Sequence, residues 1–508
     1  MPADSSNPTA SEAQGGSPAY RLSANGAGTG TPVGTGLDAL ASVNPHAPAV
    51  TCGNLTLTRR GLAARSNQLA RHLEGLGVGV GDLVTIGLPN SVEFYVATVA
   101  AWKLGAIPQP VSARLPAAEI AALIEIADPK VVIGLEPPDD RPWLPPGFEP
   151  DPQLSDRSLP PATPPYWKAP TSGGSTGRPK IIISGTAGTR EDILARAPGL
   201  RIDPGSVFLV TAPLYHNAPF MFSLIALVNA GHVVVMERFD PADILEQVQR
   251  HRVTWLYAVP TQMGRILRLP ENVRRSTDLS SVRTMLHVGA PCPEHVKRGW
   301  LEWIEPGRLL ELYAGTESTA VCIIDGEDWL RHPGSVGKPV SGELLITDDE
   351  FQPLPPGEVG EVWMRPPPDT VTYHYLGAVA RERDGWESIG DMGSLDEEGY
   401  LYLADRRADM ILVGGANVYP AEVEAALESH PSVASAAVIG LPDDDLGNVV
   451  HAIVQTTAEV SDDELTAHVR EHLVSYKVPR TFERSPDPLR DDTGKVRRSA
   501  LRTARLPS

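Results

Sequence analysis

A glycine- and hydroxyl-rich loop at residues 171–180 constrains this chain more than any other stretch. The loop reads Thr-Ser-Gly-Gly-Ser-Thr-Gly-Arg-Pro-Lys, and the three isoleucines that follow at 181–183 predict a buried strand. Its three glycines let the backbone turn closely and direct N–H groups at an anion, while the hydroxyls and Lys180 add donors and positive charge. The pattern predicts a phosphate-binding loop, with a flexible Ser/Gly connection as the alternative.

This loop differs from the Walker type of phosphate loop, which places Gly-Lys-Ser/Thr at the start of a helix. Here Pro179 separates Arg178 from Lys180, and β-branched residues follow the lysine. The phosphate is therefore expected to lie over the entry to a strand.

Length and charge narrow the class of protein. The chain has 508 residues, 42% of them hydrophobic, and this length predicts two or more domains of a soluble globular protein. Acidic residues outnumber basic ones by 63 to 44, a net charge of −19, so nucleic acid is not an expected partner. The three cysteines have no metal-ligand spacing, and neither a signal peptide nor a membrane span is visible, so we expect a cytoplasmic protein.

Composition and periodicity predict an α/β fold with a large N-terminal domain at 37–406 and a small α+β C-terminal domain at 407–508. Residues 1–36 are rich in Ser, Gly, Thr, Ala and Pro, which predicts a disordered tail. Alternating helices and strands from residue 59 to about residue 312 predict a parallel sheet covered by helices. Short segments at 342–346 and 360–364 predict a smaller antiparallel region.

Residues suited to ligand binding follow three predicted strands, at the edge where open α/β sheets place ligands. His216 follows the strand at 207–211 and is expected to line or gate a substrate pocket, unless it is a hydrogen-bonded structural histidine. The segment 313–317 offers an aromatic face for a base, a hydroxyl for a phosphate and a carboxylate suited to Mg²⁺. Small residues at 288–291 leave room for a flat ring. Both of these segments also fit plain turns.

Further candidates lie in the second half of the chain. Asp391 and Arg406 supply charges that suit ribose hydroxyls, the loop at 414–420 precedes a helix, and Lys495 lies on a tight turn near the end. Taken alone, the charged residues fit solvated surface positions, and the lysine fits an exposed side chain.

The order of these segments resembles that in the acyl-adenylate-forming (ANL) superfamily. The matching segments, in order, are the loop at 171–180, the turn at 313–317, Asp391, Arg406, the loop at 414–420 and Lys495. Over roughly residues 40–500 the chain is similar to acyl-CoA synthetases, or AMP-dependent ligases, close to fatty-acid or aryl-acid CoA ligases and to amide bond synthetases. Peptide synthetase adenylation domains and luciferases belong to the same superfamily.

The resemblance implies an AMP-forming ligase with a mobile C-terminal domain and two half-reactions. A carboxylate first attacks the α-phosphorus of ATP to give an acyl-adenylate and pyrophosphate, and the acyl group then passes to a nucleophile. ATP and Mg²⁺ are the implied cofactors. Both reactants of the first step are anions, so catalysis must position them and neutralise charge.

The resemblance also implies roles for individual residues. The expected catalytic residues are Lys495, which bridges carboxylate and phosphate, His216, Thr316, which contacts the α-phosphate, and Glu317, which holds Mg²⁺. The expected nucleotide-binding residues are Thr171, Ser172, Gly173, Gly174, Ser175, Thr176, Gly177 and Lys180 for the phosphates, Gly289, Ala290, Pro291 and Tyr313 for adenine, and Asp391 and Arg406 for ribose. The expected substrate pocket comprises Tyr215, His216, Asn217, Phe220, Met221 and Gly315, and its aromatic side chains suit an aromatic or bulky acid.

Two departures from the family pattern bear on the second half-reaction. The hinge, two positions after Arg406, is usually Asp or Lys but here is Ala408, which removes side-chain contacts that distinguish the two orientations of the small domain. Ala314 replaces a common glycine and only requires an ordinary φ.

The acceptor therefore has alternatives. CoA is expected because it is the commonest acceptor of stand-alone members and because Gly414 and Gly415 match a loop that approaches CoA. A free amine, as in amide bond synthetases, is the rival, and a carrier-protein thiol is less expected. A non-catalytic nucleotide or acid sensor on the same fold is an alternative of another class, against which the pair Glu317 and Lys495 argues.

Overall fold

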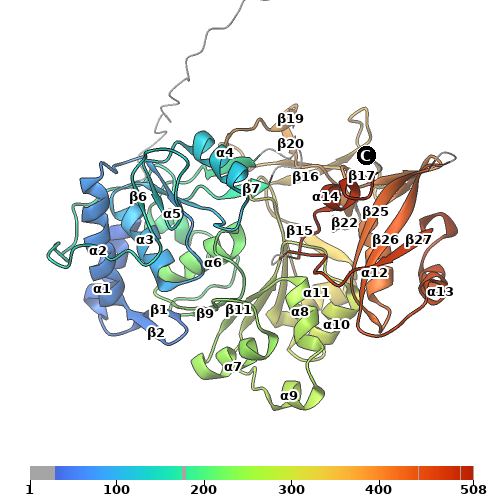
Figure 1. Ribbon diagram of the computed structural model, residues 1–508, viewed down its shortest axis with the longest axis horizontal. Helices are drawn as coiled ribbons and strands as arrows, with labels where there is room; N and C mark the ends of the chain where they lie inside the picture. The colour runs from blue at the N-terminus through green and yellow to red at the C-terminus, as the bar shows by residue number, and fades with distance from the viewer. Residues whose placement is uncertain (1–28, 174–178, 444–445, 492–493, 507–508) are drawn as a thin grey trace, which may run out of the picture.

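The computed structural model describes residues 29–173, 179–443, 446–491 and 494–506. In Figure 1 a large body of sheets and helices, coloured blue to light orange, lies beside a smaller unit coloured dark orange to red. The boundary between them falls close to residue 406, at the end of the last strand of the large body.

Fifteen of the described strands form one sheet through the large body. They are β1 (Pro48–Cys52), β2 (Leu55–Thr58), β9 (Val207–Val210), β10 (His232–Val235), β11 (Trp255–Ala258), β12 (Thr284–His287), β13 (Leu309–Tyr313), β14 (Val321–Asp325), β15 (Ser335–Ser341), β16 (Glu343–Thr347), β17 (Gly360–Arg365), β19 (Arg381–Arg383), β20 (Trp386–Ser388), β21 (Asp391–Leu395) and β22 (Leu401–Arg406). The order is β19-β20-β17-β21-β22-β15-β14-β13-β12-β11-β9-β10-β1-β2, with β16 paired to β17.

This sheet has a parallel half and an antiparallel half. From β1 through β10, β9, β11 and β12 to β13 the strands pair in parallel, whereas the pairs from β13 through β14, β15, β22 and β21 to β17 are antiparallel. The predicted antiparallel region at 342–346 and 360–364 is confirmed as β16 and β17. It continues the parallel sheet through β14 and β15, so it is not a separate sheet.

Helices connect the strands of the large body. They are α1 (Val33–Val43), α2 (Arg59–Gly75), α3 (Val92–Lys103), α4 (Ala117–Ala127), α5 (Arg190–Leu194), α6 (Asn217–Val228), α7 (Pro241–His251), α8 (Pro260–Leu267), α9 (Glu271–Ser276), α10 (Glu294–Leu301) and α11 (Gly326–Arg331). The Ser91 hydroxyl accepts a hydrogen bond from the Phe94 N–H at 3.3 Å and so caps the N-terminus of α3.

Two smaller sheets complete the large body. The first, in the order β4-β3-β5-β6, is parallel and contains β3 (Leu83–Ile86), β4 (Ile107–Pro110), β5 (Val131–Ile133) and β6 (Trp143–Leu144). Helix α3 contacts strands of this sheet and of the large sheet, which explains why nearly all of its side chains are apolar and buried. The second, in the order β18-β8-β7, is antiparallel and contains β7 (Thr171–Gly173), β8 (Pro179–Ser184) and β18 (Tyr373–Leu376).

The smaller unit has its own cores. Its helices are α12 (Pro420–Glu428), α13 (Asp462–His472) and α14 (Arg498–Thr503), and its strands are β23 (Ile411–Val413), β24 (Ala416–Val418), β25 (Val433–Asp443), β26 (Gly447–Thr456) and β27 (Thr481–Arg484). Two clusters of buried apolar residues are formed only by residues beyond position 410. A core of this kind is what a C-terminal α+β unit requires.

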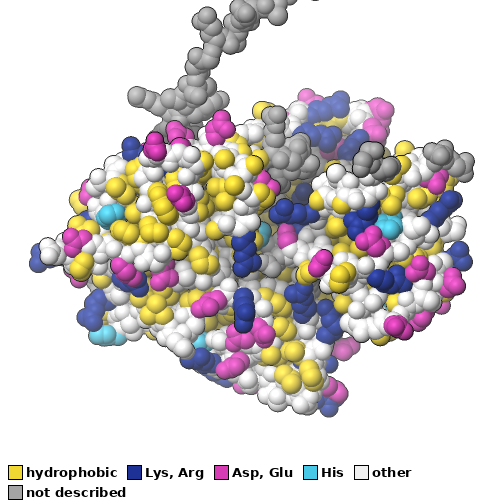
Figure 2. Space-filling view, viewed as in Figure 1, with side chains coloured by type: hydrophobic (Ala, Val, Ile, Leu, Met, Phe, Trp, Pro, Cys, Tyr) yellow, Lys and Arg dark blue, Asp and Glu magenta, His cyan; other side chains and the backbone are white. Residues whose placement is uncertain are grey.

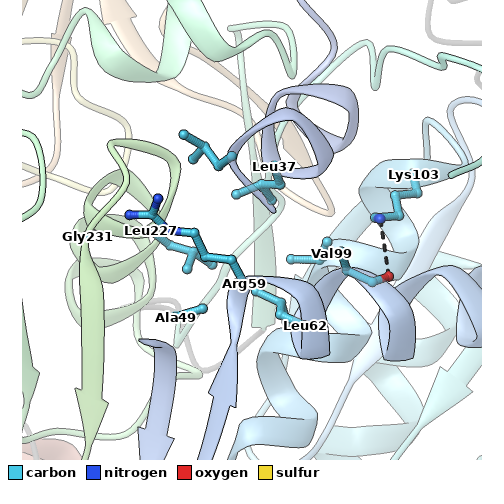
Figure 3. A pocket seen from close by; sticks show the side chains of 10 residues that line it. Leu37, Ala49, Arg59, Leu62, Val99, Lys103, Leu227 and Gly231 are labelled. Atoms are coloured by element: carbon cyan, nitrogen blue, oxygen red, sulfur yellow. Dashed lines mark hydrogen bonds between the residues drawn. The ribbon is translucent and has the colours of Figure 1, made fainter. Parts of the chain in front are cut away.

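A buried lysine joins the first three helices. Lys103 is 5% exposed, and its ammonium donates to the side chains of Asp38 and Asn67 at 2.5 Å and to the Ala63 carbonyl at 3.5 Å. Figure 3 shows it beside a small depression lined by apolar side chains of α1, α2 and α3. Burial lowers the pKa of Lys103, and Asp38 opposes this effect. The contacts identify Lys103 as a structural residue.

The last residues of the predicted N-terminal tail belong to a helix. Most of the tail predicted at 1–36 lies outside the described residues, but its last part does not: α1 begins at Val33, and Val33 is fully buried. The prediction of disorder was wrong for residues 33–36. Their Gly- and Thr-rich composition resembles that of the preceding residues, although they form the first turn of α1. In the described part of the chain, no helix has both the length and the apolarity needed to cross a bilayer.

Candidate active site

The parallel half of the large sheet brings three predicted site segments to one edge. Strands β9, β12 and β13 point the same way, and their carboxyl ends lead respectively into the segment with His216, the segment 288–291 and the turn 314–317. Open parallel sheets bind ligands at this edge because the loops there leave a crevice. The three segments therefore follow strands whose carboxyl ends lie at the same edge of one parallel sheet.

The predicted phosphate loop joins two antiparallel strands. Strands β7 and β8 are antiparallel and pair with Ser172 opposite Lys180 and Gly173 opposite Pro179. The residues Gly174, Ser175, Thr176 and Gly177, to which phosphate binding was assigned, lie outside the described residues.

Lys180 and Glu317 form an ion pair at this edge. The Lys180 ammonium donates to Glu317 Oε1 at 2.9 Å and to the hydroxyl oxygen of Tyr375 at 2.8 Å, and the Tyr375 hydroxyl donates to the same Glu317 oxygen. Burial of Glu317 opposes its ionisation, but the Lys180 charge and the Tyr375 hydroxyl outweigh it and hold the pKa of Glu317 below its ordinary value. A carboxylate that stays ionised is suited to a hard divalent cation.

Tyr313, Asp391 and Arg406 form a second cluster. The Tyr313 hydroxyl donates to Asp391 Oδ2 at 2.7 Å, and Arg406 Nε lies 3.3 Å from Asp391 Oδ1. These residues come from β13, β21 and β22, and Asp391 pairs directly with Arg406 across the β21–β22 ladder. Burial raises the pKa of Asp391, with Arg406 and Tyr313 acting in the opposite direction. A carboxylate beside an aromatic ring can bind ribose hydroxyls while the ring faces a base.

The C-terminal unit brings Lys495 to the same cleft. Gly494, at φ +79°, lies against Thr261 and Ala290, and a Cβ at this position would be 3.2 Å from Thr261 Oγ1. Lys495 interacts electrostatically with Arg406, Asp391 and Glu317 of the large body. Figure 2 shows Lys and Arg side chains around the depression between the large body and the smaller unit. Glycine at 494 thus lets the lysine-bearing turn approach the large body closely.

Burial and the neighbouring charges act on the Lys495 ammonium in opposite directions. Solvent reaches its side chain, but the protein walls displace part of its water, and this desolvation together with Arg406 lowers the pKa of Lys495. Asp491, Asp391 and Glu317 act in the opposite direction. Lys495 thus lies among both acidic and basic groups. An anion bound beside it would favour its charged form and raise its pKa.

His216 stands beside the lysine at the N-terminus of α6. Burial lowers the pKa of His216 to about 4, and the nearby Lys495 ammonium adds to this effect. Its Nε2 is buried and, among the described residues, has no hydrogen-bond partner. A neutral imidazole with an unused polar atom in the cleft is suited to contact a bound substrate.

Of the predicted acid-pocket residues, Tyr215 and Asn217 flank His216, and the Tyr215 and His216 rings lie 4.2 Å apart. Phe220 is fully buried and packs on Phe94 with ring centroids 5.8 Å apart, so it belongs to the core beneath α6. Gly315 leaves room for Glu317, because a Cβ there would lie 2.7 Å from Glu317 Oε2.

Two residues that we did not predict also belong to this region. Tyr375 completes the Lys180–Glu317 cluster from β18, a strand that pairs with β8. Lys168 is 4% exposed and donates to Asn217 Oδ1 at 2.7 Å, and burial lowers its pKa to about 7. The signal for Lys168 was a charged residue within the apolar stretch that leads into the phosphate loop. No local sequence pattern distinguished Tyr375 from other tyrosines in predicted strands.

The predicted hinge residue Ala408 and the glycines Gly414 and Gly415 lie in turns. Ala408 is exposed and lies in a turn in which the N–H groups of Asp409 and Met410 donate to the Arg406 carbonyl. Gly414 and Gly415 form the tip of the β23–β24 hairpin, and the Gly414 N–H donates to the Leu446 carbonyl in the same unit. Lys495 interacts electrostatically with Arg406, Asp391 and Glu317 of the large body, and Asp491 of the same unit with His216, whereas the described hydrogen bond of Gly414 stays within the C-terminal unit.

Comparisons with known proteins define the class to which this fold and cleft belong. A family model described as AMP-binding enzyme matches residues 37–376, and one described as AMP-binding enzyme C-terminal domain matches residues 422–495. The protein is an AMP-forming ligase with the two-part architecture of that class. The chain belongs to the AMP-binding enzyme family within the ANL superfamily, which confirms the resemblance seen in the sequence.

Individual relatives cover nearly the whole chain. A feruloyl-CoA synthase from an Amycolatopsis species is 32% identical over 91% of this chain and 96% of its own length. The o-succinylbenzoate CoA synthetase of Bacillus subtilis, solved with its acyl-adenylate intermediate, is 28% identical with a TM-score of 0.78, covering 93% of this chain and 99% of that one. The same protein has been solved with ATP and magnesium ion. An amide bond synthetase from Marinactinospora thermotolerans is 25% identical with a TM-score of 0.75, covering 94% and 100%.

Proposed function

We propose that this ligase activates an aromatic or otherwise bulky carboxylic acid with ATP and then transfers the acyl group to the thiol of CoA. One observation carries the proposal. Glu317 of the large body and Lys495 of the C-terminal unit lie at one cleft and interact electrostatically. A cation and a cation-binding carboxylate on opposite walls suit a reaction between two anions.

In the proposed first step, a carboxylate oxygen attacks the α-phosphorus of ATP, and the bond to the pyrophosphate oxygen breaks. Lys495 neutralises charge on the attacking carboxylate and on the α-phosphate, because it can approach both as a flexible point charge. Thr316 lies on the turn that carries Glu317, and its hydroxyl is assigned to the α-phosphate. Lys180, in β8, is assigned to the leaving pyrophosphate.

The residues present fit a nucleotide and its magnesium ion. Glu317 is ionised and bonded to a lysine and a tyrosine hydroxyl, both of which can turn to phosphate oxygens when a cation takes the carboxylate. Asp391 is assigned to ribose, and Tyr313 with the 289–291 segment to adenine, because they share one edge of the sheet. Bound Mg²⁺ would offset phosphate charge as pyrophosphate leaves.

The aromatic character of the acid rests on the side chains near His216 and on the relatives. Tyr215 and His216 offer flat rings at the cleft edge, and the feruloyl and succinylbenzoate enzymes are named for acids that contain a benzene ring. Lys168 and Asn217 add polar groups on the same side, which suit a hydroxyl or carbonyl substituent on the ring.

A free amine is the second candidate acceptor. Ala408 lacks the charged side chain that is usual at the hinge, and the amide bond synthetase shares the fold over nearly the whole chain. An enzyme that passes its adenylate directly to an amine would not need the rotation of the C-terminal unit. The sensor alternative has no support from the relatives, whose names are those of ligases.

The deciding experiment supplies ATP, Mg²⁺ and a panel of aromatic acids, with CoA in one series and simple amines in the other. Pyrophosphate release is measured in both series, and products are separated by mass. We expect thioester in the CoA series and no amide at low amine excess. Amide formation without thioester would establish the amine as acceptor, and acid-dependent pyrophosphate release in neither series would contradict the proposed ligase function.

A further inference from the structure

A cluster of histidines lies on the C-terminal unit, at the end of α13, and the active site makes no use of it. His468, Glu471 and His472 are close enough for one ligand atom of each to lie within 4.8 Å of the other two. His468 and His472 are separated by one helical turn, and Glu471 is three residues after His468, so all three project toward one side of the helix. His468 is partly buried, and the other two side chains are exposed.

The hydrogen bonds of His468 determine which of its nitrogens is available. Its Nε2 lies 3.1 Å from the carbonyl oxygen of Ala426 and 2.8 Å from the Ser429 hydroxyl, which itself donates to the same carbonyl at 2.7 Å. A carbonyl oxygen only accepts, so Nε2 carries the proton and Nδ1 carries the lone pair. Histidines that bind metals usually donate their other ring N–H to a carbonyl or carboxylate in this way, because this fixes the ring and its tautomer.

A neighbouring histidine differs in this respect. The ring of His430 lies 5.0 Å from that of His468, but its Nδ1 accepts the Ser432 N–H at 3.1 Å, and its Nε2 lies 3.5 Å from Glu464 Oε1. Its lone pair is therefore already used. His430 forms a wall of the cluster and is not one of its ligands.

We propose that His468, Glu471 and His472 form a binding site for a divalent transition-metal ion of the zinc class on the outer side of the C-terminal unit. Two imidazoles and a carboxylate are a ligand set that Zn²⁺ accepts with a water in the fourth position. Ligand atoms on tetrahedral zinc lie about 3.4 Å apart, and the exposed His472 and Glu471 side chains can turn to close the remaining distance. Mg²⁺, which prefers oxygen ligands in octahedral geometry, does not suit this site.

The bound ion would fasten two helices. It would clamp the last turn of α13, and through the His468 ring it would tie that turn to the end of α12 at Ala426 and Ser429. The site is thus expected to stabilise the C-terminal unit and to leave acid activation unchanged.

The test measures Zn²⁺ binding to the full-length protein without ATP, by competition with a colorimetric zinc indicator. We expect one zinc ion per chain in the wild type and a loss of more than about tenfold in affinity in His468→Gln and His472→Gln. Glu471→Gln is expected to weaken binding less, because both imidazoles remain. His46→Gln, which changes an exposed histidine of the large body, is the matched control and is expected to bind zinc as the wild type does.

Two further arms make the result decisive. Glu317→Gln tests whether zinc binds instead at the carboxylate of the cleft, and undiminished binding in this variant supports the helix site. Co²⁺ in place of Zn²⁺ is expected to give the visible absorption of a tetrahedral complex in the wild type and not in His472→Gln. Zinc affinity that is unchanged in both histidine variants, or lost in Glu317→Gln, would overturn the proposal.

Discussion

The two walls of the cleft are held together in different ways. On the wall to which we assign the nucleotide, the Lys180–Glu317 ion pair and the bond from Tyr313 to Asp391 join residues of the large body to one another. On the opposite wall, Lys495 belongs to the C-terminal unit, and its position depends on how the two units are oriented. The wall with Glu317 and Asp391 therefore forms when the large body folds. The wall with Lys495 forms only when the C-terminal unit contacts the large body.

The contacts around the hinge show the same division at the scale of single residues. Arg407 donates to Glu361 at 2.9 Å and to Asp349 at 2.6 Å, both in the large body. Asp409, only two residues later, accepts from Arg498 of α14 at 2.9 Å. The chain thus passes from one set of anchors to the other across Ala408.

Arg498 strengthens the anchor on the side of the C-terminal unit. Its guanidinium also donates to both carboxylate oxygens of Glu424 at 2.9 Å, and the neighbouring charges raise its pKa although burial opposes this. Asp405, at the end of β22, accepts the Ala421 N–H at 2.7 Å, so one residue of the large sheet is also tied to the C-terminal unit. A rotation of the unit would have to break this last contact.

The largest effect on catalysis is expected from removing the Lys495 ammonium, which reaches the cleft only when the C-terminal unit contacts the large body. Lys495→Ala should lower acid-dependent exchange of pyrophosphate into ATP by about 10³-fold, because no other side chain of the C-terminal unit is assigned to the reacting phosphate. ATP binding, measured by calorimetry, should survive, since the nucleotide wall is intact. Arg497→Ala removes an exposed cation two residues away and serves as the control. Exchange at the wild-type rate in Lys495→Ala would remove the lysine from the proposed mechanism.

A second prediction tests whether the hinge matters for one half-reaction only. Ala408→Pro should slow acyl transfer to CoA by roughly an order of magnitude while sparing pyrophosphate exchange, because proline restricts the torsions that a hinge must change. The turn donors Asp409 N–H and Met410 N–H stay in place. Ala408→Gly, which adds freedom, is the matched control and should transfer normally. If both half-reactions of the proline variant fall together, the hinge account is wrong.

Much of this architecture could be predicted from the sequence, because it depends on local patterns. The alternation of helices and strands from residue 59 to about residue 312 was expected, since apolar periodicity and flanking turns determine such elements. The convergence of the segments after β9, β12 and β13 followed from parallel pairing. The continuity of the antiparallel strands with the parallel sheet could not be predicted, because it depends on which edges pair.

The site was less predictable where it depends on distant contacts. Tyr375 reaches Glu317 only because β18 pairs with β8, and no spacing in the sequence indicates that pairing. Lys168 was visible as a charge in an apolar stretch, but its partner Asn217 is 49 positions away. The side chains at 174–177, where the phosphate assignment began, lie outside the described residues, so their roles stay predictions.

A third prediction concerns the wall that the large body builds alone. Tyr375→Phe removes one donor to Glu317 but leaves the Lys180 ion pair, so pyrophosphate exchange should fall only about three- to tenfold. The hydroxyl lowers the pKa of Glu317, so its loss should raise that pKa and move the acidic limb of the rate profile to higher pH.

The control for this prediction is Tyr373→Phe, which removes a neighbouring hydroxyl bonded to Glu387. It should leave the pH profile of exchange unchanged. The same shift in both variants would indicate a general loosening of β18 and not a specific contact with Glu317.

The smallest effect on catalysis, and a distinct effect on stability, is expected at Lys168. Its pKa is about 7 in the folded protein against an ordinary value of 10.5, so the unfolded chain holds one more proton between these two pH values. Wild-type stability should therefore rise with pH across this window relative to Lys168→Met, by at most about 1.4 kcal/mol per pH unit. Below pH 7 the lysine is charged in both states, and the difference between the two proteins should be constant.

The measurement for Lys168 compares the midpoints of urea denaturation of wild type and Lys168→Met at several pH values from 6 to 9. Loss of the bond to Asn217 destabilises the variant equally at all of these pH values, so only the change of the difference with pH reports the buried charge. Lys130→Met, which changes an exposed lysine of the large body, is the control. A difference that does not vary with pH would mean that Lys168 keeps an ordinary pKa, and that this side of the cleft wall is more hydrated than its burial indicates.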